Sequence, residues 1–186
     1  WWPRGLGDPT LYSLRIELLN PQGNVAAEHV QTIGIRTLEL VQTEITTEEE
    51  PGEFVFVVNG QKVFIKGTNH VPLDALHGRD NRHLDTLLSM TADLNCNMLR
   101  IWGGGVYETD TFYDRCDELG IMVWHDFMFG CALYPQTDDF LEQAREEAEV
   151  VVKRLRHHAC MALWSGNNEN DVAHDWFPLH SKLNPN

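Results

Sequence analysis

Long hydrophobic runs are missing from this 186-residue sequence. No apolar segment approaches the roughly 20 residues that a membrane-spanning helix needs, and the amino terminus lacks the basic and then apolar layout of a signal peptide. No membrane partner is therefore predicted. Because the chain begins at Trp1 and not at a methionine, we expect it to be a processed or excerpted sequence.

Positive charge is also scarce. The chain has 14 lysine and arginine residues against 28 aspartate and glutamate residues, for a formal net charge of -14. Proteins that bind nucleic-acid backbones carry basic patches that displace counterions, so a nucleic-acid partner is excluded and a neutral ligand fits better. Hydrophobic content of 42% is ordinary for a globular protein and sets disordered and collagen-like classes aside.

Cysteine is too scattered for a zinc or redox motif. The four cysteines are Cys96, Cys116, Cys131 and Cys160. They form no Cys-x-x-Cys pair, and His125-Asp126 and His157-His158 lack a third ligand at metal-site spacing. We predict buried free thiols, no metal and no cofactor. The cysteine pattern leaves the cellular compartment open.

The amino-terminal part of the chain is rich in strand patterns. Residues 11–18 and 30–40 are alternating or β-branched, and a turn at residues 20–24 separates them, as is typical of a hairpin. Because two or three strands make a poor independent domain, we interpret residues 1–46 as the closing strands of a sandwich. The acidic tract at residues 46–50 is predicted to be a solvated connector.

From residue 47 to residue 186 the pattern changes to alternating strands and helices. Strands are predicted at residues 55–58, 62–66, 97–102, 121–126 and 160–165, with a turn at Asn59-Gly60. Helices are predicted at residues 81–95, at 109–119 with Gly120 ending the helix, and at 137–157, and a further helix begins near Asp171 before Pro178. The four strand-helix units that start at residue 62 are half of an eightfold barrel or most of a small doubly wound sheet.

Polar residues at the strand ends favour the barrel. The clusters are Asn69-His70, Arg100 with Trp102, His125-Asp126 and Asn167-Asn168-Glu169. A (β/α)8 (TIM) barrel carries its active site at the carboxyl ends of its strands. We therefore predict an α/β fold that comprises the first four units of such a barrel, preceded by sandwich strands.

Glu169 is the best candidate for an acid. It follows the apolar run 161–164 and lies among amides, which can bind sugar hydroxyls while the acid protonates a glycosidic oxygen. The same run is also good helix-capping chemistry, and the residues alone leave both interpretations open. Arg100 is equally open, as a salt-bridge partner of Asp126 or Glu169 or as a catalytic group.

Taken together, these motifs resemble glycoside hydrolase family 2 of the β-mannosidase type. The matching segments include Trp1-Trp2-Pro3, Lys66-Gly67, Asn97-Met98-Leu99-Arg100-Ile101-Trp102, Phe112-Tyr113, Asp126-Phe127-Met128-Phe129 and Trp164-Ser165-Gly166-Asn167-Asn168-Glu169-Asn170. They cover almost the whole chain. Asn167-Asn168-Glu169 resembles the mannosidases more than the galactosidase or glucuronidase branches.

The resemblance implies an immunoglobulin-like sandwich that leads into a (β/α)8 barrel, and retaining removal of terminal β-linked mannose from non-reducing ends. Carried over by position, Glu169 matches the acid/base, and the substrate-binding residues are Asn168, Trp102, Asp126, Arg100 and Asn69. Asn168 matches the amide at the sugar's 2-hydroxyl, and Arg100 the arginine that supports the nucleophile. His70 departs from the family, which usually has tryptophan there.

The resemblance also implies that the nucleophilic glutamate follows the seventh strand of the barrel, which this chain does not reach. We therefore expect the chain alone to be inactive, because an acid without a nucleophile cannot form the glycosyl-enzyme intermediate. We also expect the open edges of the barrel to favour self-association. The alternatives are another family 2 exo-β-glycosidase, of galactosidase or glucuronidase type, and a non-catalytic carbohydrate-binding fragment.

Overall fold

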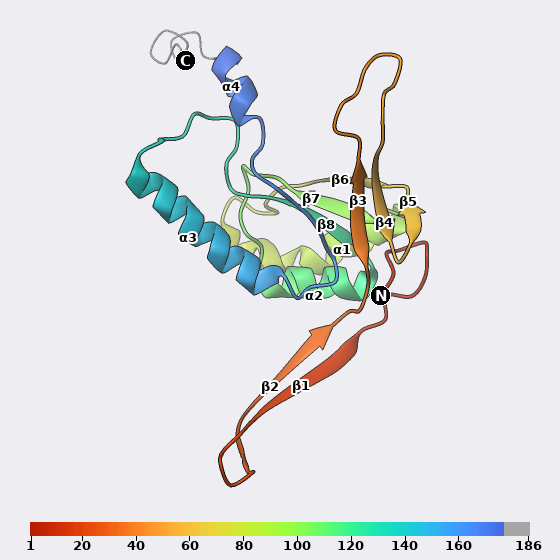
Figure 1. Cartoon of the computed structure of the whole chain (residues 1–186), viewed down its shortest axis with the longest axis vertical. Helices are drawn as coiled ribbons and strands as arrows, with labels where there is room; N and C mark the ends of the chain where they lie inside the picture. Colours follow the sequence, from red (N-terminus) through yellow and green to blue (C-terminus); the bar gives the residue numbers. More distant parts are fainter. Residues whose placement is uncertain (177–186) are drawn as a thin grey trace.

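The computed structural model describes residues 1–176, in which antiparallel strands precede parallel strands that alternate with helices (Figure 1). The first sheet is a long hairpin of β1 (Tyr12–Leu19) and β2 (Val25–Ile33). The second sheet contains β3 (Leu38–Gln42), β4 (Phe54–Val58) and β5 (Gln61–Val63) in antiparallel order. This confirms the mixed α/β class at its coarsest level.

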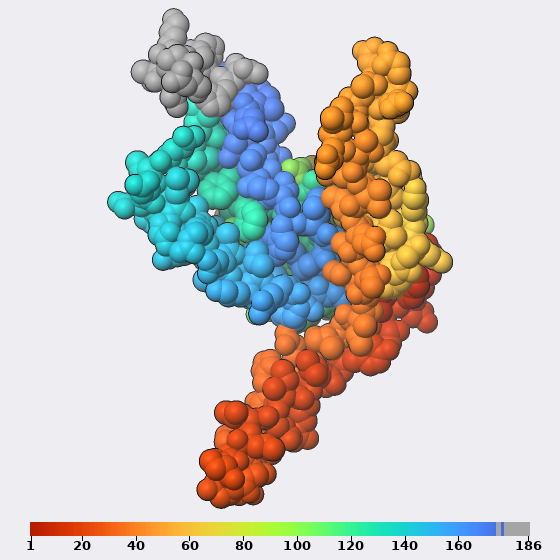
Figure 2. Space-filling model, in the orientation of Figure 1, coloured from red at the N-terminus to blue at the C-terminus, as the bar shows by residue number. Residues whose placement is uncertain are grey.

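The β1–β2 hairpin and the hairpin formed by β3 and β4 project from the body of the described chain in different directions (Figure 2). The β1–β2 turn lies at residues 20–24 as predicted, where Asn20 Oδ1 accepts the backbone N–H groups of Gln22 and Asn24, each at 3.0 Å. The strand-rich segment at residues 30–40 contains the end of β2 and the start of β3, and residues 34–37 between them belong to neither strand. There, a Cβ on Gly34 would lie 2.5 Å from the Cβ of Ala159, so the backbone presses against the body of the protein.

The acidic tract at residues 46–50 is solvent-exposed and forms the loop of a hairpin. β3 precedes this tract and β4 follows it, and they pair from Leu38 opposite Val58 to Gln42 opposite Phe54. Thr43 fastens the base of the loop, since its Oγ1 accepts the Glu53 N–H at 2.9 Å. The sequence on the two sides of residue 46 therefore shares one sheet.

A parallel four-stranded sheet follows, in the order β6 (Gly67–His70), β7 (Met98–Ile101), β8 (Met122–Asp126) and β9 (Met161–Ser165). For the last three strands, every predicted end lies within one residue of the observed end. The first strand does not match its predicted range, because the Asn59-Gly60 turn folds Gln61–Val63 back onto β4 as β5. Asn69 and His70 consequently lie inside the first parallel strand instead of beyond its end.

Helices connect these strands. They are α1 (Leu84–Asp93), α2 (Asp110–Leu119), α3 (Asp138–Leu155) and, after β9, α4 (Asn170–Trp176). The first helix begins three residues later than predicted, because residues 77–82 form a short 3₁₀ helix, η1 (His77–Arg82), in which the Asp80 carboxylate accepts the Asp74 N–H at 2.8 Å. The helix after Asp171 is confirmed, and Pro178 lies outside the described residues.

The hydrophobic core lies between the parallel sheet and its helices. Its fully buried members include Leu88 of α1, Phe112 and Tyr113 of α2, Leu155 of α3, and Leu99, Ile101 and Val123 of the strands. Because side chains alternate along a strand, Arg100 and Trp124 face away from these helices.

Among the described residues, every helix is too short or too polar to cross a membrane.

Gly120 ends α2 as predicted, in the left-handed conformation with φ of 69°. A Cβ there would lie 2.9 Å from the Arg4 backbone nitrogen, so an alanine meets both backbone strain and a collision. We expect Gly120→Ala to lower the free energy of unfolding by about 1 to 3 kcal/mol, measured by urea denaturation. Gly78→Ala is the matched control, because a Cβ at Gly78 meets open space. Equal urea midpoints for the two variants would contradict this account of the helix end.

Candidate functional site

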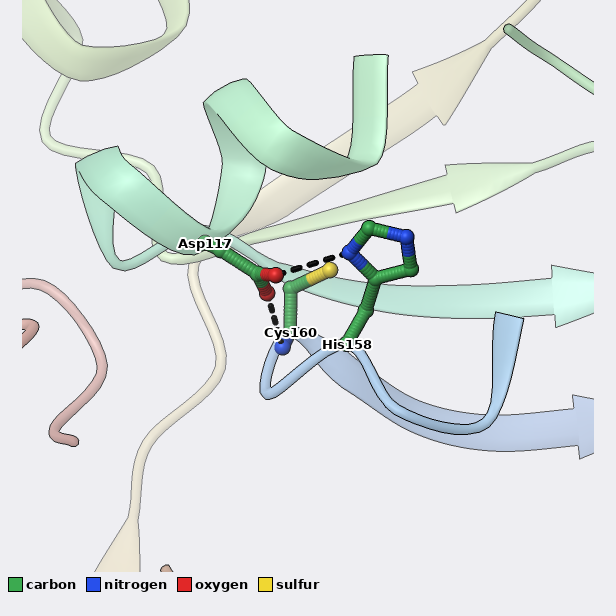
Figure 3. Close-up of side chains that lie close together, drawn as sticks. All are labelled: Asp117, His158 and Cys160. Carbon is green, nitrogen blue, oxygen red and sulfur yellow. Dashed lines mark hydrogen bonds and ion pairs between the residues drawn. The ribbon is translucent and has the colours of Figure 1, made fainter. Parts of the chain in front are cut away.

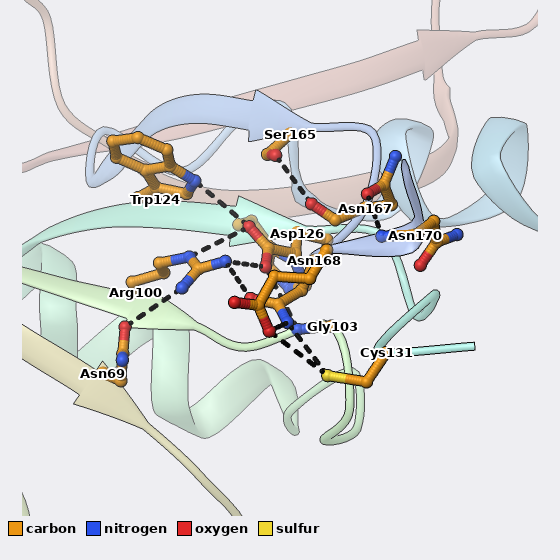
Figure 4. A network of polar contacts seen from close by, with 12 residues as sticks. Asn69, Arg100, Gly103, Trp124, Asp126, Cys131, Ser165, Asn167, Asn168 and Asn170 are labelled. Carbon is orange, nitrogen blue, oxygen red and sulfur yellow. Dashed lines mark hydrogen bonds and ion pairs between the residues drawn. The ribbon is translucent and has the colours of Figure 1, made fainter. Parts of the chain in front are cut away.

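Arg100 and Asp126 form the centre of a polar network at the carboxyl ends of β7 and β8 (Figure 4). Arg100 Nη2 lies 2.6 Å from Asp126 Oδ2, and Arg100 Nε lies 3.2 Å from Oδ1. Asp126 is fully buried, and it also accepts the Trp124 indole N–H at 3.1 Å and the Gly103 backbone N–H at 3.2 Å. The salt bridge that the sequence left open is therefore formed with Asp126.

Arg100 also reaches β6 and the segment that follows β9. Its Nη2 donates to Asn168 Oδ1 at 2.8 Å, and its Nη1 donates to Asn69 Oδ1 at 3.3 Å. One guanidinium thus joins side chains from β6, from β8 and from the segment after β9. Since the oxygen of Asn168 is held by Arg100, its amide nitrogen is directed to the opposite side, where it lies 3.2 Å from Glu169 Oε2.

Glu169 stands in the turn between β9 and α4, with φ of 60° and an exposed side chain. Capping of α4 falls to Asn167, whose Oδ1 accepts the Asn170 N–H at 3.1 Å. The capping interpretation thus applies to Asn167, and the Glu169 carboxylate is left beside the Asn168 amide. An exposed carboxylic acid next to a fixed amide can meet a sugar hydroxyl or a glycosidic oxygen.

Trp102 and His70 lie outside this network. Trp102 follows β7, and its indole packs so closely over Gly104 that a Cβ there would lie 2.1 Å from the ring. His70 faces the helices: its Nε2 is 2.7 Å from Glu108 Oε1, and both residues are buried. The tryptophan-to-histidine departure thus lies in a buried polar pair and not in the polar network around Arg100.

The sequence missed three members of the site. Trp124 could have been found, because it lies two residues before Asp126 on the same face of β8. The glycine run at residues 103–105 is a signal for close approach of the backbone to a pocket, whereas the Cys131 thiol has no comparable signal. Both are placed by loop backbone, and Cys131 Sγ lies 3.5 Å from Glu169 Oε2.

The chain is similar in sequence and in structure to known glycoside hydrolases. The family model described as Glycosyl hydrolases family 2 matches residues 1–36. The Bos taurus β-mannosidase is 46% identical over 93% of the chain, and the Aspergillus clavatus β-mannosidase B is 41% identical over 91%. The crystal structure of the β-D-mannosidase from Dictyoglomus thermophilum aligns with a TM-score of 0.83 and 46% identity, over 91% of this chain and 21% of its own. The chain is a family 2 β-mannosidase homologue.

This β-mannosidase homologue spans about a fifth of the length of the curated relatives it matches, since it covers 20% of both the bovine and the fungal protein. The Parabacteroides merdae β-glucuronidase also aligns, with a TM-score of 0.71 at 22% identity. That likeness extends to the fold alone. The β-mannosidase relatives are about twice as similar in sequence.

A second buried polar group in this chain contains Asp117, His158 and Cys160 (Figure 3). Their potential ligand atoms lie within 4.8 Å of one another, a grouping that sequence spacing did not reveal. Asp117 is already engaged, because its Oδ2 is 2.8 Å from His158 Nδ1 and its Oδ1 accepts the Cys160 N–H at 2.7 Å. Burial, together with the nearby Asp117 carboxylate, raises the pKa of the Cys160 thiol. We interpret the group as a set of hydrogen bonds that joins α2 to the segment just before β9.

The cysteine prediction is confirmed in part. All four cysteines carry free thiols; Cys116 and Cys160 are buried, whereas Cys96 and Cys131 are half-buried. Burial also raises the pKa of Cys116. The two buried thiols are therefore neutral packing groups, and Cys131 is the thiol that lies at the polar network.

His125 lies next to Asp126 on the opposite face of β8, where it is fully buried on the helix side. Its Nδ1 is 2.7 Å from the Asp126 backbone oxygen, and its Nε2 is 2.9 Å from the Tyr113 hydroxyl. Because the Asp126 carbonyl only accepts, Nδ1 carries the proton and Nε2 accepts from Tyr113. Burial lowers the pKa of His125 to about 4, which fits a neutral ring with both nitrogens satisfied.

This assignment predicts acid-dependent stability. An unfolded histidine titrates near pH 6.5, so between that pH and about 4 the unfolded chain binds a proton that the folded chain does not. Falling pH therefore lowers the free energy of unfolding, by roughly 3 kcal/mol over this range. In urea denaturation at several pH values, His125→Gln is expected to remove that component, whereas the exposed His29→Gln retains it. The same pH dependence in both variants would show that His125 titrates alike in the folded and unfolded chain.

Proposed function

We propose that this chain is a segment of a retaining β-mannosidase, and that Glu169 is the general acid/base of the whole protein. The observation that carries the proposal is the contact of Glu169 with an amide whose orientation is set by the buried Arg100–Asp126 pair. Identity of 46% to a β-mannosidase over 93% of the chain supports mannose as the sugar over galactose or glucuronic acid. Removal of terminal β-linked mannose from non-reducing ends is the reaction proposed.

The proposal assigns residues 47–186 to the first half of a (β/α)8 barrel. In support, four parallel strands follow one another in chain order, with helices between them and polar side chains at their carboxyl ends. Both outer strands of this sheet, β6 and β9, are edges within the described residues. Four further strands of a longer chain would close the barrel between these edges. In the isolated chain, the same edges favour self-association.

Residues 1–46 are assigned to the closing strands of an immunoglobulin-like sandwich. One face of the β1–β2 hairpin supports this, because its alternate side chains are apolar and exposed: Tyr12, Leu14, Ile16 and Leu18. A strand of a two-sheet sandwich buries such a row against the facing sheet. β3 pairs with β4 across the proposed boundary, so the linkage between the two parts includes backbone hydrogen bonds.

The remaining residues take supporting and binding roles. Asn168 binds the sugar near its 2-hydroxyl, while Asn69 and Trp102 border the subsite as a hydrogen-bonding amide and an apolar ring face. Arg100 and Asp126 are organising residues. Asp126 is a poor nucleophile because both of its oxygens are occupied by donors from Arg100, Trp124 and Gly103.

The nucleophilic carboxylate is therefore proposed to come from another part of the whole protein. A retaining glycosidase places that carboxylate about 5 to 5.5 Å from the acid/base. The ligand proposed is a β-mannoside glycan, with no nucleic acid and no membrane as partner. The isolated 186-residue chain is expected to be inactive.

Hydrolysis of aryl glycosides tests the proposal. The whole protein is expected to hydrolyse an aryl β-mannoside well and the matching galactoside and glucuronide poorly. Glu169→Gln is expected to lower its kcat by roughly 10²- to 10⁴-fold, because the proton donor is lost. Glu146→Gln, an exposed substitution on α3, is the matched control and is expected to retain activity.

Two outcomes would reject the proposal: no preference for the mannoside, or wild-type turnover by Glu169→Gln. The isolated chain is assayed alongside. Turnover by the purified 186-residue chain at the rate of the whole protein would contradict the assignment of the nucleophile to another segment.

A further inference from the structure

Cys131 lies in the loop after β8, where the backbone holds it firmly. Its N–H donates to the Asn168 backbone oxygen at 2.8 Å, and the Asn168 N–H donates to the Phe129 oxygen at 2.8 Å. These two bonds form a parallel bridge between the loop and the segment after β9. The loop is therefore joined by backbone hydrogen bonds to the residue that precedes Glu169.

The backbone conformation of Cys131 is unusual. Its φ is 53°, and the φ of Glu169 is 60°, a left-handed region that residues other than glycine seldom occupy. Each such residue costs about 1 to 3 kcal/mol, and such strain persists only where surrounding contacts enforce it. Two residues in this conformation, one on each side of the same contact, are consistent with a site whose geometry is maintained at the expense of stability.

The thiol makes two contacts. Cys131 Sγ lies 3.5 Å from Glu169 Oε2, and the Asn168 amide Nδ2 lies 3.2 Å from both the sulfur and that oxygen. The amide donates to sulfur and to the carboxylate, while the thiol donates to the carboxylate. Thiol, amide and carboxylate thus form a closed triangle that fixes one oxygen of Glu169.

We propose that Cys131 is a positioning residue for Glu169, whose thiol holds the acid in the orientation needed to protonate the leaving group. The role rests on the proposed function of Glu169. A thiol is a weak donor, so its contact sets the orientation of the carboxyl group. A hydroxyl at this place donates more strongly, and an alanine leaves the oxygen without its thiol contact.

The dependence of hydrolysis on the leaving group tests this role in the whole protein. A mannosyl leaving group, as in β-1,4-mannobiose, needs the proton, whereas 2,4-dinitrophenolate leaves with little help. Cys131→Ala is expected to lower kcat/KM, which reports the step in which the leaving group departs, by roughly tenfold for the disaccharide and by less than about twofold for the dinitrophenyl mannoside. Cys131→Ser is expected to restore part of the disaccharide activity, and the half-buried Cys96→Ala serves as the control that leaves both rates unchanged. Equal losses on both substrates, or no loss on either, would overturn the proposal.

A second measurement needs no enzymatic activity. In this chain, the rate at which iodoacetamide alkylates Cys131 is followed by peptide mass spectrometry, with Cys96 as the internal reference. Glu169→Ala is expected to raise the Cys131 rate severalfold, because the substitution removes the carboxylate that contacts the sulfur and opens the sulfur to the reagent. An unchanged rate rejects the contact whatever the activity. A whole protein that hydrolyses no β-mannoside rejects the proposed function instead.

Discussion

The buried ion pair between Arg100 and Asp126 is the constraint on which the site depends. A carboxylate with no solvent exposure is costly unless its charge is paired and its lone pairs are filled, and Asp126 meets both conditions through four donors from Arg100, Trp124 and Gly103. These donors come from two strands and a loop. They converge only when β7 and β8 are parallel and Arg100 lies opposite Trp124, as the register has it. The pairing of the sheet and the stability of the charge are therefore the same requirement.

A series of hydrogen bonds links this ion pair to the exposed Glu169. Arg100 holds the oxygen of Asn168, the amide of Asn168 faces Glu169, and the loop carrying Cys131 is tied to the same segment by backbone hydrogen bonds. Asn167 caps α4, which leaves the carboxylate of Glu169 free of helix-capping duty. On the helix side, His125 stays neutral beneath Asp126 and adds no competing charge. The contacts of the buried network thus hold the exposed Glu169 carboxylate in position.

Much of this arrangement could be predicted from the sequence, because strand periodicity and parallel order bring strand ends to one edge. Arg100, Asp126, Asn168 and Glu169 were expected together on that basis. The first parallel strand was predicted five residues too early, since a local turn at Asn59-Gly60 pairs β5 with β4 before β6 begins. The contact of Cys131 with Glu169 depends on two left-handed backbones and a loop bridge, which no local pattern of residue types encodes.

The most direct test of the central claim is a double-mutant cycle on the free energy of unfolding with Arg100→Met and Asp126→Asn. Each single substitution leaves a partner charge or its hydrogen-bonding groups unsatisfied in the interior, at a cost of about 3 kcal/mol. Removing both partners relieves part of that penalty, so the account predicts a coupling energy of at least about 2 kcal/mol. Losses that add to within roughly 0.5 kcal/mol would contradict it and show that the ion pair does not organise the site.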